Sequence, residues 1–232
     1  MNILITRPLI DSEDLMGKLF SLGHKIVHIP TLKISASNVV PIDAKKYDAF
    51  IFTSTNAIRN LKLNNQDNSK ICFCVGSITE KIVRQKGYHN TISAGGTINA
   101  LKNIILNSDQ IDKKKSIAYF CGDYISSNLD IELKNDGFQI DKIINYTSEK
   151  ITDLNEENNK IINNHPPDII FIYSKRSAES FIDIVKKYSL NGLMTESRVL
   201  CISEKVLSVF KNFGWKKLEV FQSGEELEKL KV

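Results

Sequence analysis

The sequence predicts an α/β protein built from two related parallel-sheet domains. Short apolar runs alternate with stretches of helical period along the whole chain, which is typical of parallel strands covered by helices. The length of 232 residues allows one large domain or two small ones. Hydrophobic residues make up 42% of the chain and charged residues 25%, as in an ordinary globular protein.

Ten short runs are the predicted strands, at residues 3–6, 25–29, 49–53, 71–75, 91–93, 117–121, 139–145, 168–173, 198–202 and 217–221. Helical patterns lie between most of them. Leu15 and Leu19 mark the first helix, which we expect to begin with Asp11 or Ser12 as its cap and to end at Gly23. The same pattern ends at Gly87, Gly137 and Gly214.

Three ungapped alignments indicate that the chain repeats itself. Residues 3–26 align with residues 117–140 and place Gly23 on Gly137. Residues 48–61 align with residues 168–181 in the same way. The spacing from Cys74 to Gly87 also equals that from Cys201 to Gly214. Any strand–helix–glycine unit resembles another to some degree, but three alignments together favour two related domains.

Two segments do not fit the alternation of strand and helix. Residues 31–40 (TLKISASNVV) and 146–151 (YTSEKI) are extended, rich in Thr and Ser, and polar at alternate positions. We expect them to be two crossings between the domains that pair as a small ribbon. Domain 1 is then discontinuous, with residues 1–33 and 151–232, and domain 2 comprises residues 34–150, linker strands included.

Charge and cysteine content narrow the class of protein. The net charge of +4 suits an anionic small molecule but is weak evidence for nucleic acid. The chain has no apolar run long enough to cross a membrane, and its start resembles no secretory signal, so we predict a cytoplasmic protein. The four cysteines lie in apolar runs and, like the histidines, lack metal-site spacing, so buried structural thiols are expected.

Small hydroxyl residues follow the predicted strands at their carboxyl ends, where ligands bind in parallel α/β sheets. They include Thr6, Thr53, Ser54, Ser77, Thr79, Ser174 and Ser203. With the backbone N–H groups of helix starts, such residues bind carboxylates and phosphates. The structural alternative is that each is a helix N-cap, which favours the same residue types.

The ordered set of these motifs closely resembles the uroporphyrinogen-III synthase family over nearly the whole chain. The set comprises Thr6-Arg7-Pro8, FTSTNAI at 52–58, VGSIT at 75–79, INYTSEK at 144–150 and Ser174. The resemblance implies an enzyme, a lyase that closes hydroxymethylbilane to uroporphyrinogen III, inverts ring D and loses water in haem biosynthesis. It also implies two flavodoxin-like parallel-sheet α/β domains joined by a two-stranded β linker, and no metal or coenzyme.

The resemblance assigns residues to two roles. Tyr146 matches a tyrosine thought to assist departure of the substrate hydroxyl, although it has an alternative role as a packing residue. The implied substrate-binding residues are Thr6, Arg7, Thr53, Ser54, Asn56, Ser77, Thr79, Ser174, Lys175 and Ser203. The implied partners are the small-molecule substrate and, in transient contact, hydroxymethylbilane synthase. We expect a monomer that binds neither nucleic acid nor membrane.

The sequence departs from the family pattern at three places. Ser203-Glu204-Lys205-Val206 stands where many members carry Gly-Pro-Thr-Thr, Lys175-Arg176 replace Pro-Ser, and an arginine frequent after Cys121 is missing. Two other classes also remain open: a non-catalytic protein that binds an anionic small molecule in a hinge cleft, and a nucleotide-dependent α/β enzyme. The missing glycine-rich phosphate loops disfavour the second of these.

Overall fold

A computed structural model describes residues 1–38 and 40–230 of the chain, and residues 39 and 231–232, which the predicted domains include, lie outside the described part. The chain divides into two compact units. Unit 1 contains Met1–Lys33 and the chain from Glu149 onward, and unit 2 is Ile34–Ser148. Both divisions fall within strands, β3 (Leu32–Ala36) and β10 (Gln139–Lys150).

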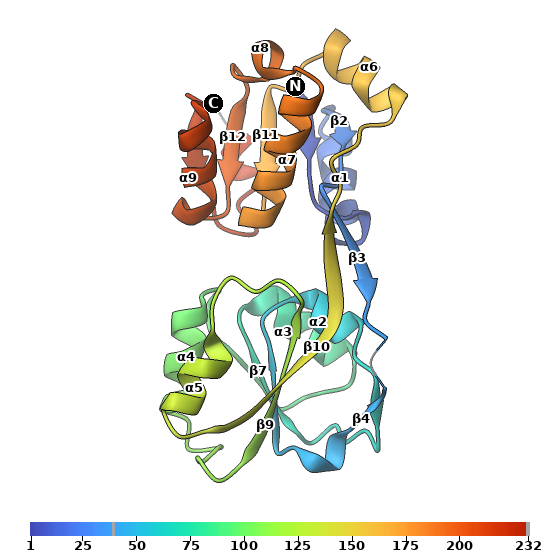
Figure 1. Cartoon of the computed structure of the whole chain (residues 1–232). Coiled ribbons are helices and arrows are strands. Elements are labelled where there is room, and N and C mark those ends of the chain that lie inside the picture. The colour runs from blue at the N-terminus through green and yellow to red at the C-terminus, as the bar shows by residue number, and fades with distance from the viewer. Residues whose placement is uncertain (39, 231–232) are drawn as a thin grey trace. The chain divides into compact units, whose positions relative to one another are not determined.

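The sheet of unit 1 has the strand order β13-β12-β11-β1-β2, and every neighbouring pair is parallel (Figure 1). Its strands are β1 (Asn2–Ile5), β2 (Lys25–His28), β11 (Ile169–Ile172), β12 (Arg198–Cys201) and β13 (Leu218–Val220). The central strand β11 is buried at all four of its positions. Burial on both faces explains why the parallel strands appear in the sequence as continuous apolar runs.

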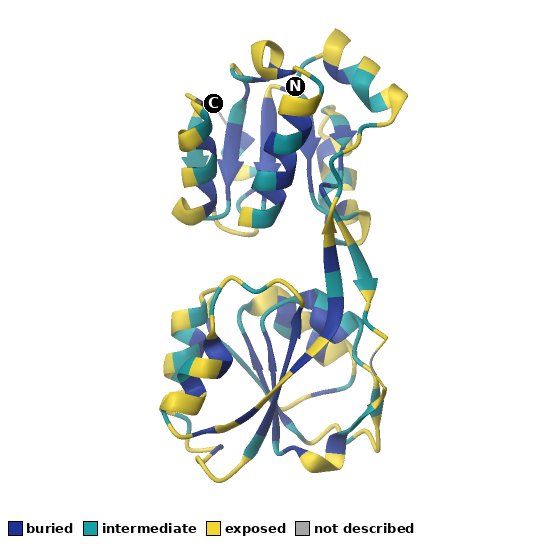
Figure 2. Ribbon diagram, in the orientation of Figure 1, coloured by how far each residue is buried: buried dark blue, intermediate teal, exposed yellow. Residues whose placement is uncertain are grey.

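Helices cover both faces of this sheet. Ile170 and Ile172 of β11 pack with α6 (Glu156–Asn164), α7 (Lys175–Lys187) and α9 (Glu204–Phe213), and α8 (Asn191–Met194) lies beside them. Ile169 and Phe171 alternate to the other face, with α1 (Leu9–Ser21) and the 3₁₀ helix η2 (Glu228–Leu230). Figure 2 shows the strands as the buried layer between helices that are exposed on their outer sides.

The sheet of unit 2 has the order β3-β10-β9-β5-β7-β8. From β10 to β8, every neighbouring pair of this order is parallel. A separate two-stranded parallel sheet pairs β4 (Ile42–Asp43) with β6 (Leu63–Asn64). The other strands of the six-stranded sheet, in addition to β3 and β10, are β5 (Ala49–Phe52), β7 (Ile71–Cys74), β8 (Thr91–Ser93) and β9 (Ser116–Gly122).

Helices cover both faces of the second sheet as well. Ile51 and Phe73 point to the face covered by α4 (Ile98–Leu106) and α5 (Leu129–Asn135). The opposite face carries Phe50, Phe52, Phe120 and Tyr88, whose rings lie 5.5 to 6.3 Å apart. This face packs against α2 (Thr55–Arg59) and α3 (Ser77–Gln85), and η1 (Ala44–Lys46) joins the same cluster.

The three sequence alignments connect segments that occupy equivalent places in the two sheets. They pair β1 and β2 with β9 and β10, β11 with β5, and β12 with β7. The order β2-β1-β11-β12-β13 in unit 1 therefore matches β10-β9-β5-β7-β8 in unit 2, strand for strand. The two sheets share one topology, although the matching strands occur in a different chain order.

Several predicted strand ends are shifted by one residue, and two other predictions differ more from the structure. Helix α1 begins at Leu9 rather than at Asp11 or Ser12, because Pro8, with its fixed φ of -52°, is its N-cap. Residues 139–145 and 146–151, predicted as separate extended segments, form the single 12-residue strand β10. A register shift between Ile144 and Tyr146 interrupts the alternation of buried and exposed residues. Because of this interruption, the sequence pattern suggested two segments instead of one strand.

Candidate functional site

The residues after β5 and β7 gather at the carboxyl edge of the unit 2 sheet. Ser54 caps α2, because its hydroxyl accepts a hydrogen bond from the backbone N–H of Asn56 at 3.2 Å. The Thr53 hydroxyl lies 3.1 Å from the hydroxyl of Tyr119. Tyr119 is 2% exposed, and burial raises the pKa of its phenol. Thr53, Ser54 and Asn56 remain half-buried and present polar atoms at this edge.

Ser77 and Thr79 follow the neighbouring strand β7 at the start of α3. Ser77 is exposed, whereas Thr79 is buried. A turn at Gly95-Gly96 lies against this strand end, because the Gly96 N–H donates to the Val75 carbonyl at 2.6 Å. A Cβ on Gly76 would come within 3.3 Å of the Gly96 Cα, so the glycines let the two backbones approach closely.

Tyr146 lies in β10, next to the end of β9. Its side chain is 9% exposed and belongs to the core cluster on the α2 and α3 side of the sheet. The register pairs Tyr146 with Gly122, immediately after the shift at Ile144. The Tyr146 carbonyl accepts a hydrogen bond from the Asp123 N–H at 3.1 Å. The phenol therefore lies at the same sheet edge as the hydroxyl residues of β5 and β7.

Thr6, at the carboxyl end of β1, is part of a buried hydroxyl cluster. Its Oγ1 donates to the Phe171 carbonyl at 2.8 Å and accepts from Ser177 Oγ at 3.3 Å. The Thr31 hydroxyl lies 2.5 Å from Ser177 Oγ. Thr6, Thr31 and Ser177 are each at most 4% exposed. The Thr6 hydroxyl is thus used within unit 1, where its hydrogen bonds connect the end of β1 to β11 and α7.

Arg7 lies beside this cluster and remains half-buried. Its guanidinium carbon is 4.5 Å from the centroid of the Tyr173 ring, a cation–π contact. The Tyr173 hydroxyl donates to Glu226 Oε1 at 3.3 Å, and burial raises the pKa of Tyr173. Glu226 is 8% exposed and also accepts from the Gly224 N–H at 2.8 Å. Arg7 is therefore held at the edge by Tyr173, which in turn is held by the segment after β13.

Ser174 and Lys175 follow the neighbouring strand β11, at the start of α7. The Ser174 hydroxyl caps the helix by accepting from the Ser177 N–H at 3.0 Å. Lys175 is exposed, and its ammonium lies 3.8 Å from Glu179. Ser203 precedes α9 on the next strand and is half-buried, but its hydroxyl makes no cap hydrogen bond. Thr6, Arg7, Ser174, Lys175 and Ser203 thus lie on adjacent strands of one sheet edge.

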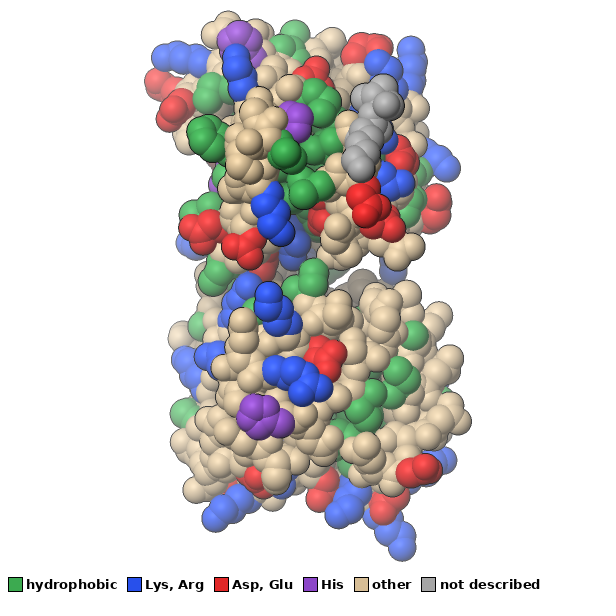
Figure 3. Space-filling view, turned by 180° about the vertical axis from the view of Figure 1, so that it is seen from behind, with side chains coloured by type: hydrophobic (Ala, Val, Ile, Leu, Met, Phe, Trp, Pro, Cys, Tyr) green, Lys and Arg blue, Asp and Glu red, His purple; other side chains and the backbone are tan. Residues whose placement is uncertain are grey.

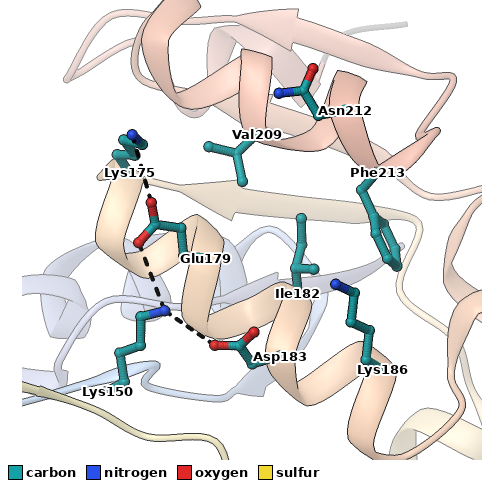
Figure 4. Close-up of a pocket in the computed structure, with 9 residues that line it drawn as sticks. All are labelled: Lys150, Lys175, Glu179, Ile182, Asp183, Lys186, Val209, Asn212 and Phe213. Carbon is teal, nitrogen blue, oxygen red and sulfur yellow. Dashed lines mark hydrogen bonds and ion pairs between the residues drawn. The ribbon is translucent and has the colours of Figure 1, made fainter.

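Lys175 also lines an open groove of about 400 Å³ between α7 and α9, shown in Figure 4. Lys150 spans two carboxylates there, at 3.7 Å from Glu179 and 3.1 Å from Asp183. Lys186 lies over the ring of Phe213. The carboxylates offset most of the lysine charge, so the groove itself is not a strongly basic site.

Several classes of site are not found in the part of the chain that the structure describes. No group of three or more His, Cys, Asp or Glu side chains there is placed to hold a metal ion. None of the described helices is long and apolar enough to span a membrane. Acidic and basic side chains are interspersed over the face shown in Figure 3 rather than gathered into one basic patch.

All four cysteines are free and buried, as the sequence predicts. Burial raises the pKa of each thiol, to about 11 for Cys121 and about 12 for Cys74 and Cys201. Thiols with such pKa values are protonated near neutral pH and are weak nucleophiles. They pack the sheets and take no part in the candidate site.

Comparison with known families shows which family the chain belongs to. The model of uroporphyrinogen-III synthase HemD matches residues 13–222. The chain belongs to the uroporphyrinogen-III synthase family. It is therefore an enzyme of haem biosynthesis, of the lyase class, and the resemblance in the ordered motifs is confirmed.

Solved structures of family members have the same fold. A uroporphyrinogen-III synthetase from Helicobacter pylori is 16% identical, with a TM-score of 0.66 over 99% of this chain and 97% of that one. A mutant uroporphyrinogen III synthase from Thermus thermophilus is 14% identical, with a TM-score of 0.61 over 100% of this chain and 97% of that one. The curated proteins contain no match to the sequence.

The structure adds residues to the candidate site of this uroporphyrinogen-III synthase family member that sequence reasoning missed. Gly122, Asp123 and Tyr119 surround Tyr146 and Thr53 in unit 2, while Tyr173 and Glu226 hold Arg7 in unit 1. One signal was present: the FCGD segment ends the predicted strand at 117–121, and a small residue there leaves room for a neighbour. No sequence pattern marks Glu226, which lies beyond the last strand.

Proposed function

We propose that this chain converts hydroxymethylbilane to uroporphyrinogen III, with inversion of ring D and loss of water. The family match over residues 13–222 is the observation that carries the proposal, together with the ordered motifs at the carboxyl edges of both sheets. Membership in the family implies this substrate.

Positioning of the substrate is the main catalytic contribution that we propose. The linear tetrapyrrole carries carboxylates, and hydroxyls, helix N-termini and basic side chains are suitable partners for them. We propose direct contacts from the half-buried or exposed residues Arg7, Thr53, Ser54, Asn56, Ser77, Ser174, Lys175 and Ser203. The buried residues Thr6 and Thr79 belong to the same set and act by holding the two edges in shape.

Tyr146 is the proposed catalytic residue. Loss of hydroxide from the substrate gives a reactive azafulvene, and the departing oxygen needs a hydrogen-bond or proton donor. A phenol donates such a hydrogen bond without being ionised. The position of Tyr146 at the edge that carries Thr53 and Ser54 supports this role, whereas its 9% exposure fits a donor that the bound substrate shields from water.

The finer architecture belongs to the same proposal. We assign two flavodoxin-like domains, residues 1–33 with 151–232 and residues 34–150, joined by a two-stranded linker formed by β3 and β10. Two backbone hydrogen bonds support pairing of these strands: Ser37 N–H to the Asn145 carbonyl at 3.1 Å, and Ile151 N–H to the Thr31 carbonyl at 2.9 Å. Their order along the two strands is antiparallel. We also propose a cytoplasmic monomer that meets hydroxymethylbilane synthase transiently.

A coupled assay tests the reaction. Hydroxymethylbilane synthase generates the substrate in the presence of this protein, and the oxidised porphyrin products are separated by chromatography. Isomer III is the expected product. Isomer I alone, the product of spontaneous closure, would contradict the proposal and would favour a protein that binds an anionic molecule without converting it.

A further inference from the structure

We propose that Gly122 and Asp123 are positioning residues for Tyr146: Gly122 provides the surface on which the phenol ring rests, and Asp123 fixes the backbone that carries it. The catalytic consequence rests on the proposed role of Tyr146. All three residues belong to unit 2, so the geometry is contained within one compact body.

Gly122 leaves the space that the Tyr146 ring occupies. A Cβ built on Gly122 would lie 2.7 Å from Cε2 and Cζ of Tyr146 and 3.0 Å from its hydroxyl oxygen. Carbon atoms in contact are normally about 3.5–4.0 Å apart, so any side chain at this position displaces the ring by roughly 1 Å. The ring is 9% exposed and packed in a core cluster, which leaves it little room to retreat.

The requirement for glycine here is spatial rather than conformational. Gly122 is absent from the glycines with positive φ, so its backbone conformation is open to other residues. It is the last residue of β9 and pairs with Tyr146 directly after the register shift in β10. With this register shift, the Tyr146 ring lies against Gly122. The contact between the ring and the glycine therefore sets the position and the direction of the phenol.

Asp123 holds β10 on both sides of Thr147. Its backbone N–H donates to the Tyr146 carbonyl at 3.1 Å, and its Oδ1 accepts from the Ser148 N–H at 2.9 Å. The same oxygen accepts from the Tyr124 N–H at 2.9 Å. These bonds continue the pairing of β9 with β10 past the bulge, where strands otherwise lose register. The carboxylate therefore fixes the strand segment from which the Tyr146 side chain projects.

Displacing the Tyr146 ring by roughly 1 Å is enough to slow the proposed reaction. Catalytic groups need placement within about 0.5 Å, and a misplacement of about 1 Å costs up to roughly 10²-fold in rate. We expect Gly122→Ala to lower kcat about tenfold or more with KM nearly unchanged, because the carboxylate-binding residues stay in place. Combining Gly122→Ala with Tyr146→Phe should lower kcat no further than the stronger single change, since both remove the same contribution.

Melting temperatures test the contact itself, independently of activity. Gly122→Ala should lower the melting temperature in the wild-type background. In the Tyr146→Ala background the ring is gone, and the same change should leave the melting temperature unchanged or raise it, because alanine restricts the unfolded chain. Gly17→Ala is the matched control, since a Cβ there meets nothing within 4 Å. Equal losses in both backgrounds would overturn the role of Gly122.

The Asp123 variants test the second half of the proposal. Asp123→Asn keeps an oxygen that accepts from the Ser148 N–H and should retain most of the wild-type kcat, whereas Asp123→Ala should lower kcat severalfold. Equal kcat values for the two variants would overturn the role of Asp123. If the wild-type protein yields only isomer I, the proposed function fails, and the melting-temperature comparison still decides whether Gly122 supports the Tyr146 ring.

Discussion

The hydroxyl of Thr31 lies 2.5 Å from the hydroxyl of Ser177, and both side chains are at most 4% exposed. The pair joins the residue before β3 to the first turn of α7, across 146 positions of sequence. Ser177 Oγ also reaches Thr6 Oγ1 at 3.3 Å. One buried serine therefore ties together the end of β1, the start of β3 and α7.

We predict that Ser177→Ala lowers the free energy of unfolding by about 1–3 kcal/mol, the cost of leaving buried hydroxyls without a partner. Urea denaturation measures the change. Ser208→Ala on α9 is the control, because that exposed hydroxyl only contacts the Lys205 carbonyl of its own helix, and its effect should stay within about 0.5 kcal/mol. Equal stability of the two variants would contradict a structural role for this cluster.

Tyr146→Phe should slow the reaction without changing its product. General acid assistance contributes about 10²–10⁴-fold, and we expect a loss at the lower end or below, because the leaving group is reactive and other donors surround it. Chromatography of the oxidised porphyrins should still show isomer III, diluted by spontaneous isomer I.

Tyr47→Phe is the matched control for this substitution. Tyr47 is also 9% exposed and in the same core cluster, but its hydroxyl donates to Asp141 at 3.0 Å, away from the proposed site residues. Its turnover should equal that of the wild type. A wild-type rate in Tyr146→Phe with freshly made substrate would leave Tyr146 as a packing residue.

The contribution of Glu219 to stability should disappear in acid. Hydrogen bonds from Lys229 and Arg198 hold the pKa of Glu219 below its ordinary value of 4.5. A lowered pKa in the folded state stabilises the protein above pH 4.5, and this stabilisation is lost as the pH falls through the folded-state value. Because the Glu219 side chain is 36% exposed and each of its two partners is 28% exposed, the contribution is at most about 1 kcal/mol.

Unfolding of wild type and Glu219→Gln across this pH range checks the prediction. The two proteins should differ in stability at pH 7, and the difference should shrink as the pH falls below 4.5 and vanish once the pH has passed the lowered folded-state pKa of Glu219. Glu196, whose ion pair with Lys217 is largely exposed, provides a comparison variant, Glu196→Gln, with a smaller difference at pH 7. A difference between wild type and Glu219→Gln that stays constant down to pH 3 would refute the linkage.

The cysteines should resist alkylation in the folded protein. All four are buried, and burial raises the pKa of each thiol, so little thiolate is present at pH 8. Iodoacetamide followed by mass spectrometry should show almost no modification of the native protein and four adducts after denaturation in urea. Rapid labelling of a single cysteine under native conditions would show that its strand end opens locally.

The sequence by itself determined the elements and the topological repeat. Parallel strands buried on both faces must be apolar at every position, so runs such as IIFI in β11 and ICFC in β7 are visible without a structure. Glycine marks the end of α9 because Gly214 adopts the left-handed conformation, with φ of 89°, that other residues avoid. The resemblance to the family, and the reaction that it implies, rested on short motifs of adjacent residues. Such motifs can be recognised in the sequence without knowledge of the fold.

Only the tertiary structure decided which of the candidate side chains are free to meet a substrate. The sequence placed Thr6 and Arg7 together as binding residues, but folding buries the Thr6 hydroxyl against Ser177 and leaves Arg7 half-buried on Tyr173. The same holds for Tyr146, whose position depends on Gly122. A contact between residues that are distant in sequence is set by strand register and packing, and a glycine that makes room for a ring leaves no side-chain pattern to detect.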